Sequence, residues 1–183
     1  KYACLNFHYA KVIPVISIAF NVYNSNNEWC GVITFGGGAS YKLGQSYGLV
    51  SGQFLELTRM ALNGKQESTS KAMAIAIKLV KKKKPLVKLL FSYADKGQNH
   101  IGTIYQATNW YFVNESESSG NEVFYKGKWV HDRVPNTLPK EQRMKLEYRK
   151  KSGKYKYVYP LSNKLKDKCL ELRKSYPKKN PTK

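Results

Sequence analysis

The stretch that decides the fold runs from Phe91 to Trp110 and reads FSYADKGQNHIGTIYQATNW. The apolar run Leu89–Phe91 predicts a buried strand, and polar side chains follow it at once. Polar groups that crowd the end of a strand, ahead of a predicted helix, are typical of a functional site in an α/β fold. The alternative is a polar turn that only caps and connects two elements. We favour an active site, because a structural segment of this length would show a cleaner apolar stripe.

The segments before this stretch alternate between predicted strands and one predicted helix. Val15–Tyr23 and Cys30–Phe35 are expected to pair as a hairpin, and Phe54–Leu62 has the alternation of a further strand. Ser68 or Thr69 can cap a helix that is apolar nearly all round, so we expect that helix to be largely buried. The resulting order is strand, long loop, strand, capped helix, strand, helix, strand.

The segments after this stretch are more polar. Glu122–Arg133 predicts a hairpin, Lys140–Lys151 a weakly amphipathic helix, and Asn163–Tyr176 a second basic helix. We therefore expect two parts in the chain, a catalytic core over residues 1–120 and a basic, Tyr-rich extension over residues 121–183 that packs on the core.

Charge is the unusual feature of the composition. The 183 residues contain 32 Lys and Arg against 12 Asp and Glu, a net charge of +20. Such an excess attracts phosphate backbones, so nucleic acid is the expected partner. Tyrosines alternate with lysines around Tyr155 and Tyr157, a pattern that suits cations on phosphates and rings on bases. The alternative is a solvated exterior with the tyrosines in a small core.

Two further classes of protein are disfavoured by the sequence. No apolar run approaches the roughly 18 residues that span a bilayer, so we expect no membrane association. The cysteines Cys4, Cys30 and Cys169 are odd in number and form no CxxC pattern, and no segment resembles a signal peptide. Reduced thiols in a cytoplasmic protein are the expectation.

Several common chemistries lack their motifs. The chain has no GxGxxG and no GK[ST] phosphate loop, although Gly36–Gly38 follows a predicted strand. It also lacks the Asp/Asn-Pro-Pro-Tyr motif of adenine methyltransferases and the HxE and PCxxC pattern of zinc deaminases. Methyl transfer and zinc-dependent deamination are therefore disfavoured.

Four segments together resemble one family. The run SYADKGQNHIGTIYQATNW is similar to the signature of the Mom family of phage DNA-modification proteins. CLNFHYAKVIP resembles that family's early His-Tyr motif, FLELTRMAL its Phe-Leu-Glu-Leu-Ser-Arg strand, and GVITFGGGAS lies between them. The resemblance spans about residues 4–113 in the same order.

The resemblance implies both a fold and an activity. The fold is α+β, an N-acetyltransferase-like mixed sheet flanked by helices, here with a basic C-terminal extension. The activity is conversion of adenine in double-stranded DNA to a carbamoylmethylated form, which protects phage DNA from host restriction in the host cytoplasm. The target adenine must leave the base stack to reach such an enzyme. The alternatives are an acyltransferase of the same fold with another nucleic-acid or amine substrate, and a non-catalytic DNA-binding module.

The resemblance also implies roles for individual residues. Asp95 would be a base for the adenine amino group or a metal ligand, and Tyr105 would donate a proton or bind the cofactor. His8 and Tyr9 match the early motif, and His100 would complete a metal set with His8 and Asp95. The strand pair Glu56 and Arg59 completes the catalytic candidates.

Substrate and cofactor contacts are predicted at further positions. Gln106 and Asn109 would read an adenine edge by paired hydrogen bonds, and other substrate contacts are expected from Gln98, Trp110, Tyr155 and Tyr157. The cofactor candidates are Gln66, Ser68, Thr69 and Ser92. N-acetyltransferases bind coenzyme A through a glycine-containing turn, but QESTSK here lacks both glycines. The cofactor is left open between an acyl-CoA-type donor and iron.

Overall fold

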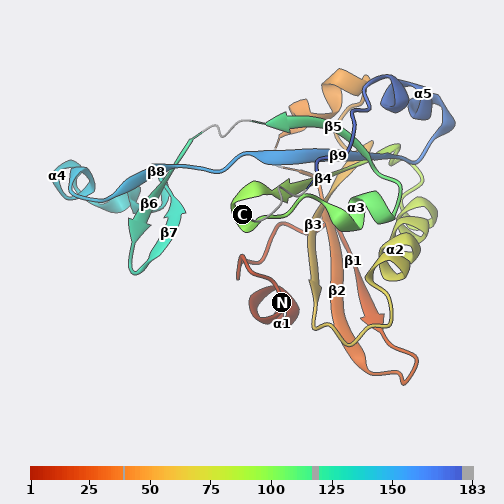
Figure 1. Cartoon of the computed structure of the whole chain (residues 1–183), viewed down its shortest axis with the longest axis horizontal. Helices are drawn as coiled ribbons and strands as arrows, with labels where there is room; N and C mark the ends of the chain where they lie inside the picture. Colours follow the sequence, from red (N-terminus) through yellow and green to blue (C-terminus); the bar gives the residue numbers. More distant parts are fainter. Residues whose placement is uncertain (39, 117–119, 179–183) are drawn as a thin grey trace.

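A six-stranded mixed sheet forms the centre of the protein in a computed structural model that describes residues 1–38, 40–116 and 120–178 (Figure 1). The strand order is β1-β2-β3-β4-β9-β5. The bounds are β1 (Ile18–Tyr23), β2 (Trp29–Gly36), β3 (Phe54–Leu62), β4 (Leu89–Asp95), β5 (Tyr111–Ser116) and β9 (Lys154–Pro160).

One pair of neighbouring strands in this sheet is parallel, and the other four pairs are antiparallel. β1, β2 and β3 are antiparallel, β3 and β4 are parallel, and β9 is antiparallel to both β4 and β5. The parallel step requires a crossover, and helix α2 (Thr69–Lys83) provides it. The predicted α+β class, a mixed sheet flanked by helices, is confirmed, as are the predicted hairpin and the order of elements up to β5.

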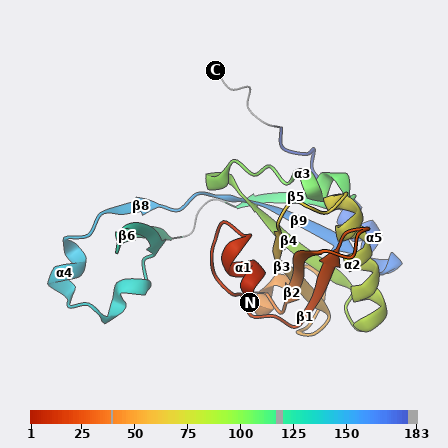
Figure 2. The same cartoon turned by 90° about the horizontal axis from the view of Figure 1, so that it is seen from below.

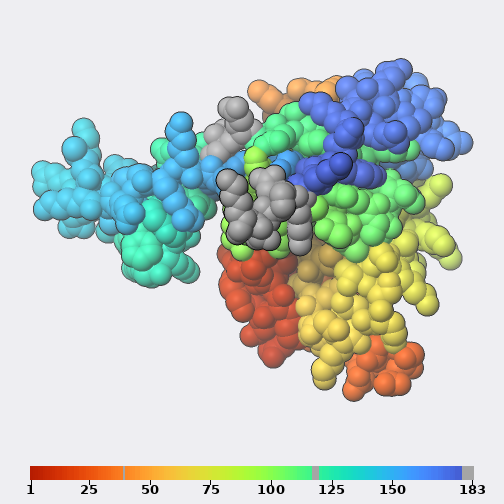
Figure 3. Space-filling view, viewed as in Figure 1, coloured from red at the N-terminus to blue at the C-terminus, as the bar shows by residue number. Residues whose placement is uncertain are grey.

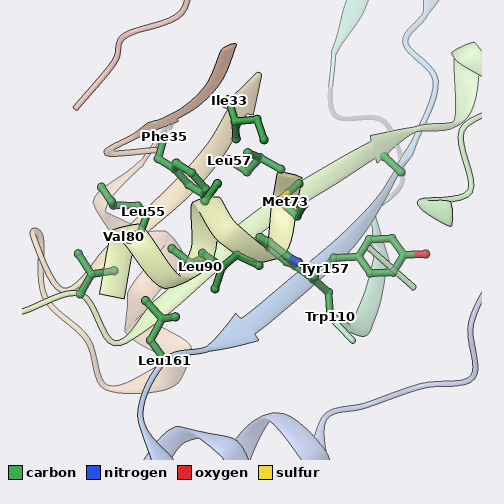
Figure 4. Close-up of a cluster of buried hydrophobic side chains, with 14 of the residues drawn as sticks. Ile33, Phe35, Leu55, Leu57, Met73, Val80, Leu90, Trp110, Tyr157 and Leu161 are labelled. Atoms are coloured by element: carbon green, nitrogen blue, oxygen red, sulfur yellow. The ribbon is translucent and has the colours of Figure 1, made fainter. Parts of the chain in front are cut away.

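Helices cover both faces of the sheet. On one face, α2 and α3 (Thr103–Ala107) enclose the main core, in which Trp110, Tyr157 and Leu90 are fully buried (Figure 4). The other face is covered by α1 (Tyr2–Asn6), the 3-10 helix η1 (Tyr41–Tyr47) and α5 (Asn163–Glu171). The sheet is therefore buried from both sides, as expected for a sheet that contains a parallel pair.

Helix α2 begins as predicted but is less buried than predicted. The Ser68 hydroxyl accepts a hydrogen bond from the Lys71 backbone N–H at 3.2 Å, which satisfies one of the free donors of the first turn. Ile75 is 48% exposed, because only one side of the helix contacts the sheet. The buried side consists of Met73, Ala76, Ile77 and Val80. Apolar residues on nearly all sides of α2 therefore did not mean that all sides of the helix are buried.

The C-terminal helices differ from the prediction. The helix expected over Lys140–Lys151 is wrong: α4 covers Lys140–Met144, and the chain then forms β8 (Tyr148–Lys150). β8 pairs with β6 (Asn121–Tyr125), so a long-range pairing overrides weak helix propensity. Helix α5 ends at Glu171, five residues earlier than expected.

Residues 120–151 form a projecting unit that we call the arm. It consists of a small sheet in the order β7-β6-β8, with β7 (Lys128–His131), together with η3 (Val134–Thr137) and α4. Two views show the arm standing away from the six-stranded sheet (Figures 1 and 2). A division of the chain at residue 120 remains a prediction, but β9, which it assigns to the extension, is an inner strand of the large sheet.

Two simpler expectations can be compared with the structure. Cys4, Cys30 and Cys169 are free and buried. Within residues 1–38, 40–116 and 120–178, no helix has the length and apolar character needed to cross a bilayer.

Truncation of the core should reveal which contacts stabilise the fold. Leu90 lies on β4 and is 0% exposed, so Leu90→Ala should lower the free energy of unfolding by about 2–5 kcal/mol. Leu86 is 72% exposed, and Leu86→Ala should change it by no more than about 0.5 kcal/mol. Urea denaturation of both variants tests this, and equal effects would contradict the assigned core.

Candidate functional site

The candidate site lies where β3 and β4 separate. These parallel strands pair only from Phe54–Glu56 to Leu89–Phe91, although β3 continues to Leu62 and β4 to Asp95. A pocket of about 450 Å³ opens beyond the last pair, and it is lined from both strands. The gap therefore lies at the carboxyl ends of a parallel pair, the usual position of a ligand site in such sheets.

The pocket brings together side chains that are far apart in the sequence. They come from the segment after α1, from β3, from β4 and from the turn that leads to α3. All of the predicted catalytic residues and the third predicted metal ligand line it: His8, Tyr9, Glu56, Arg59, Asp95, Tyr105 and His100. Proximity alone does not establish their roles, which remain predictions.

Asp95 ends β4 with a fixed carboxylate. Its Oδ1 accepts hydrogen bonds from the Gly97 backbone N–H and from the Ser152 hydroxyl, each at 2.9 Å. The first bond caps the short helix η2 (Lys96–Gln98). Across the sheet, Asp95 pairs with Lys154 of β9, which also lines the pocket. The remaining oxygen, Oδ2, has no hydrogen-bond partner among the described residues.

Tyr105 approaches the pocket from the other face of the sheet. Alternation along β4 directs Ser92 to the face opposite Tyr93 and Asp95. Ser92 is buried, and its hydroxyl donates a hydrogen bond of 2.7 Å to the Tyr105 hydroxyl. Burial raises the pKa of Tyr105 to about 12, so the phenol keeps its proton at neutral pH. Its ring packs against Trp110 and Tyr157.

His8 forms part of an aromatic wall. Its ring stacks on Tyr9 with centroids 4.4 Å apart, and Tyr9 contacts His100 edge to face at 5.5 Å. Burial, followed by the positive charge of Arg59, lowers the pKa of His8 to about 4. The Ala10 backbone N–H donates to His8 Nδ1 at 3.1 Å, so the single proton of the neutral ring belongs on Nε2. At neutral pH His8 is therefore uncharged and presents an Nε2–H donor.

Two more phenols in the pocket are neutral. Burial and then the nearby Glu56 raise the pKa of Tyr93 to about 12. Burial and then Asp95 raise the pKa of Tyr9. The pocket wall thus combines neutral O–H and N–H donors with the carboxyl groups of Glu56 and Asp95, and with Arg59, whose Nη1 donates to the Thr58 carbonyl at 2.6 Å.

The predicted metal set is not assembled as a ligand cluster. His8, His100 and Asp95 all line the pocket, but within the described part of the chain no three His, Cys, Asp or Glu side chains lie close enough to hold a metal ion. An iron site of the two-histidine, one-carboxylate kind needs three protein ligands that converge on one point. The residues present do not fit an iron site of this kind.

The predicted coenzyme A cradle does not fit either. At the start of α2, the Ser68 side chain occupies one free N–H, and Gln66 donates to the Thr69 hydroxyl at 2.8 Å. Glu67 follows Gln66, and a hydrogen bond from the Ser25 backbone N–H lowers its pKa to about 2. The Glu67 carboxylate opposes the binding of a pyrophosphate at this helix start, and Ser68 already occupies one of its backbone N–H groups. Gln66, Ser68 and Thr69 do not line the pocket between β3 and β4.

Three of the predicted substrate contacts are engaged in packing. Trp110 and Tyr157 are 0% exposed, so their rings cannot stack on a base in this conformation. The Gln106 amide donates to the Ile101 carbonyl at 3.1 Å and to the Tyr157 hydroxyl at 3.4 Å. Trp110 and Tyr157 are therefore part of the hydrophobic core. This agrees with the alternative interpretation, in which the tyrosines form a core and do not stack on bases.

The remaining predicted contacts lie outside the pocket lining. Gln98 and Asn109 are exposed, and Asn109 has the left-handed φ of 60° that ends α3. Tyr155 packs against Phe112. Tyr93 and Lys154 also line the pocket, although they were not among the predicted site residues. Tyr93 lies two residues before Asp95, so strand alternation could have predicted that both side chains share a face. Lys154 could not be identified in this way, because only the pairing of β4 with β9 brings it next to Asp95.

Comparison with solved structures gives distant similarities to acetyltransferases. One is an acetyltransferase from Bacillus subtilis in complex with CoA, with a TM-score of 0.46 and 10% identity over 79% of this chain and 76% of that one. Another is a GNAT family acetyltransferase from Elizabethkingia anophelis with acetyl-CoA bound, with a TM-score of 0.39 and 11% identity over 75% and 72%.

Sequence comparison gives a closer match. The protein named methylcarbamoylase mom of Escherichia phage Mu is 32% identical over 87 residues, 46% of this chain and 35% of the relative. The chain thus matches about a third of that relative's length. The model of the Mom protein family matches residues 1–178, nearly the entire chain. The predicted relationship is confirmed, and this chain belongs to the Mom protein family.

Proposed function

We propose that this chain is a phage DNA-modification enzyme that converts adenine to a carbamoylmethylated adenine and so protects phage DNA from restriction. One observation carries the proposal: the pocket unites the residues that match the family motifs, from segments as distant as His8, Glu56, Asp95 and Tyr105. Membership of the Mom family and the name of the phage Mu relative support it.

The chemistry of the pocket suits an adenine. Its neutral donors are the phenols of Tyr9, Tyr93 and Tyr105 and the Nε2–H of His8. Adenine offers ring nitrogens as acceptors and an exocyclic amino group as a donor. Phenols can donate to the ring nitrogens, while a carboxylate accepts from the amino group. Because that amino group is paired inside a duplex, the base must flip out to enter.

The proposed roles follow from the hydrogen bonds already described. Asp95 takes the proton of the adenine amino group through Oδ2, since Oδ1 is held by Gly97 and Ser152. Tyr105 donates a proton to the departing group of the donor, because its high pKa keeps it protonated and Ser92 supplies a second hydrogen bond to its oxygen. Arg59 stabilises negative charge that develops between them.

The first prediction concerns Asp95. Asp95→Asn retains an oxygen for Gly97 and Ser152 but removes the charge, so modified deoxyadenosine should fall at least about 100-fold. Mass spectrometry of nucleosides from DNA of cells that express each protein measures this. Asp167→Asn makes the same change at an exposed carboxylate on α5, outside the pocket and the arm, and this matched control should modify normally. Unmodified adenine with the soluble wild type would refute the adenine activity and favour another acyltransferase substrate or a binding module.

The second prediction separates Tyr105 from Ser92. Tyr105→Phe removes the proton donor and keeps the ring packing, so activity should fall by about 10²–10⁴. Ser92→Ala should have a smaller effect, about tenfold, because it only orients the phenol. Both are measured as modified deoxyadenosine formed per unit of enzyme. If Tyr105→Phe keeps full activity, the hydroxyl has no part in the chemistry.

The third prediction is a pH dependence of stability from His8. Between pH 6.5 and about 4 the unfolded chain protonates His8, whereas the folded chain keeps it neutral. The free energy of unfolding should therefore fall as the pH drops through this range, and more steeply in wild type than in His8→Gln. Urea denaturation at pH 7, 5.5 and 4.5 measures the difference. Parallel curves for the two proteins would show that the folded state does not depress this pKa.

A further inference from the structure

We infer that the arm, residues 120–151, holds double-stranded DNA by its phosphate backbone beside the pocket. The inference rests on the proposed function for the identity of the nucleic acid and goes beyond it by assigning a surface. Four properties of the arm carry it: its charge, its own small core, the position of its root and its separation from the large sheet.

Charge complementarity points to a polyanion. Residues 120–151 contain nine Lys and Arg against four Asp and Glu. Among the residues that the structure describes, the arm's exposed lysines form no ion pair with a carboxylate. They are Lys126, Lys128, Lys140, Lys145 and Lys150. Exposed lysines without a carboxylate partner can neutralise phosphates and so release their counterions. This release is the main source of non-specific DNA affinity.

The arm has internal packing that keeps its lysines in place. Val123 of β6 is 0% exposed, and Pro135 of η3 is buried as well. On the opposite face of β6, Arg149 lies 4.1 Å from the Trp129 ring centroid, and its Nε and Nη2 both donate to Glu122 Oε2. The exposed lysines can meet the phosphates of a duplex backbone. Phe124 and Tyr148 are 41% and 46% exposed and could stack on unpaired bases, so the test below includes a single strand.

The root of the arm lies at the pocket. The chain returns from β8 to β9 through Ser152, whose hydroxyl donates to Asp95, and through Gly153, whose carbonyl accepts from the Lys96 backbone N–H at 3.2 Å. The approach is close, because a Cβ on Gly153 would meet the Ser116 carbonyl oxygen at 2.5 Å. Lys154 follows and lines the pocket. A duplex held by the arm therefore lies next to the candidate catalytic carboxylate.

The shape of the molecule leaves space for such a duplex. In the space-filling view the arm and the N-terminal part of the core are separated by an open notch (Figure 3). His8 and Tyr9 belong to that N-terminal part and line the pocket. Contacts on the arm would fix the backbone while one base turns towards the pocket.

The test compares two variants with the same change in charge. The arm variant is Lys126→Gln, Lys128→Gln, Lys145→Gln and Lys150→Gln, and the control is Lys81→Gln, Lys82→Gln, Lys83→Gln and Lys84→Gln at the end of α2. All eight lysines are exposed, so the fold should survive, which circular dichroism and thermal melts check. Fluorescence anisotropy with a labelled 24-base-pair duplex gives affinities at several salt concentrations, with a single strand and a double-stranded RNA of the same sequence as competitors.

We expect the arm variant to bind the duplex about 10–100-fold more weakly than the wild type. The slope of log K against log salt concentration should become less steep by roughly 0.9 for each lysine that contacts a phosphate. The control variant should change about threefold or less. Equal losses in both variants would overturn the assignment to the arm, as would wild-type preference for single strands or RNA. Wild-type protein that binds no nucleic acid would instead refute the proposed function.

Discussion

The short pairing between β3 and β4 is the constraint on which the rest of the site depends. Only three residue pairs join these strands, yet each continues beyond them. The divergence is tolerated because each strand keeps its other neighbour: β3 pairs with β2, and β4 pairs with β9 over Leu89–Asp95. The backbone ladder on those sides holds both strands in place. The opening lets Tyr105 from one face and Asp95 from the other reach the same pocket, which a continuous sheet would keep apart.

Much of this architecture could be predicted from local sequence. Alternation in FLELTRMAL predicted β3, the apolar run LLF predicted the start of β4, and Ser68 marked the start of α2, because these signals are properties of neighbouring residues. The pocket residues were proposed largely from the resemblance to a family. The insertion of β9 between β4 and β5, and the pairing that makes β8 a strand, depend on partners at least 25 residues away. Lys154 was missed for the same reason, and Trp110 and Tyr157 were assigned to a substrate because aromatic residues serve cores and surfaces alike.

The size of the pocket and the start of α2 together constrain the donor. A volume of about 450 Å³ is at the lower end of the roughly 300–1,000 Å³ that small-molecule sites span. In the proposed reaction the pocket would hold a flipped base with a small donor group, and a nucleotide-bearing carrier would extend beyond it. A carrier such as coenzyme A would have to lie outside with its pyrophosphate on a helix start, and Glu67 makes the start of α2 unfavourable for that charge. The geometry therefore favours a compact carbon donor, or a carrier held elsewhere.

Asp95 links the chemistry of the pocket to the position of the arm. Its Oδ1 accepts from Gly97 of η2, which follows β4, and from Ser152, the first residue after the arm. Because the arm returns directly into β9, an inner strand, a displacement of its root is transmitted to the sheet beside Asp95 and not absorbed by a loose tail. We expect a movement of the arm to change the orientation of Oδ2, since Ser152 donates to Oδ1 of the same carboxylate. In the proposed reaction, contacts between the arm and the DNA backbone would then help to align Asp95 with the base, which is how binding energy distant from the reacting atoms contributes to a rate.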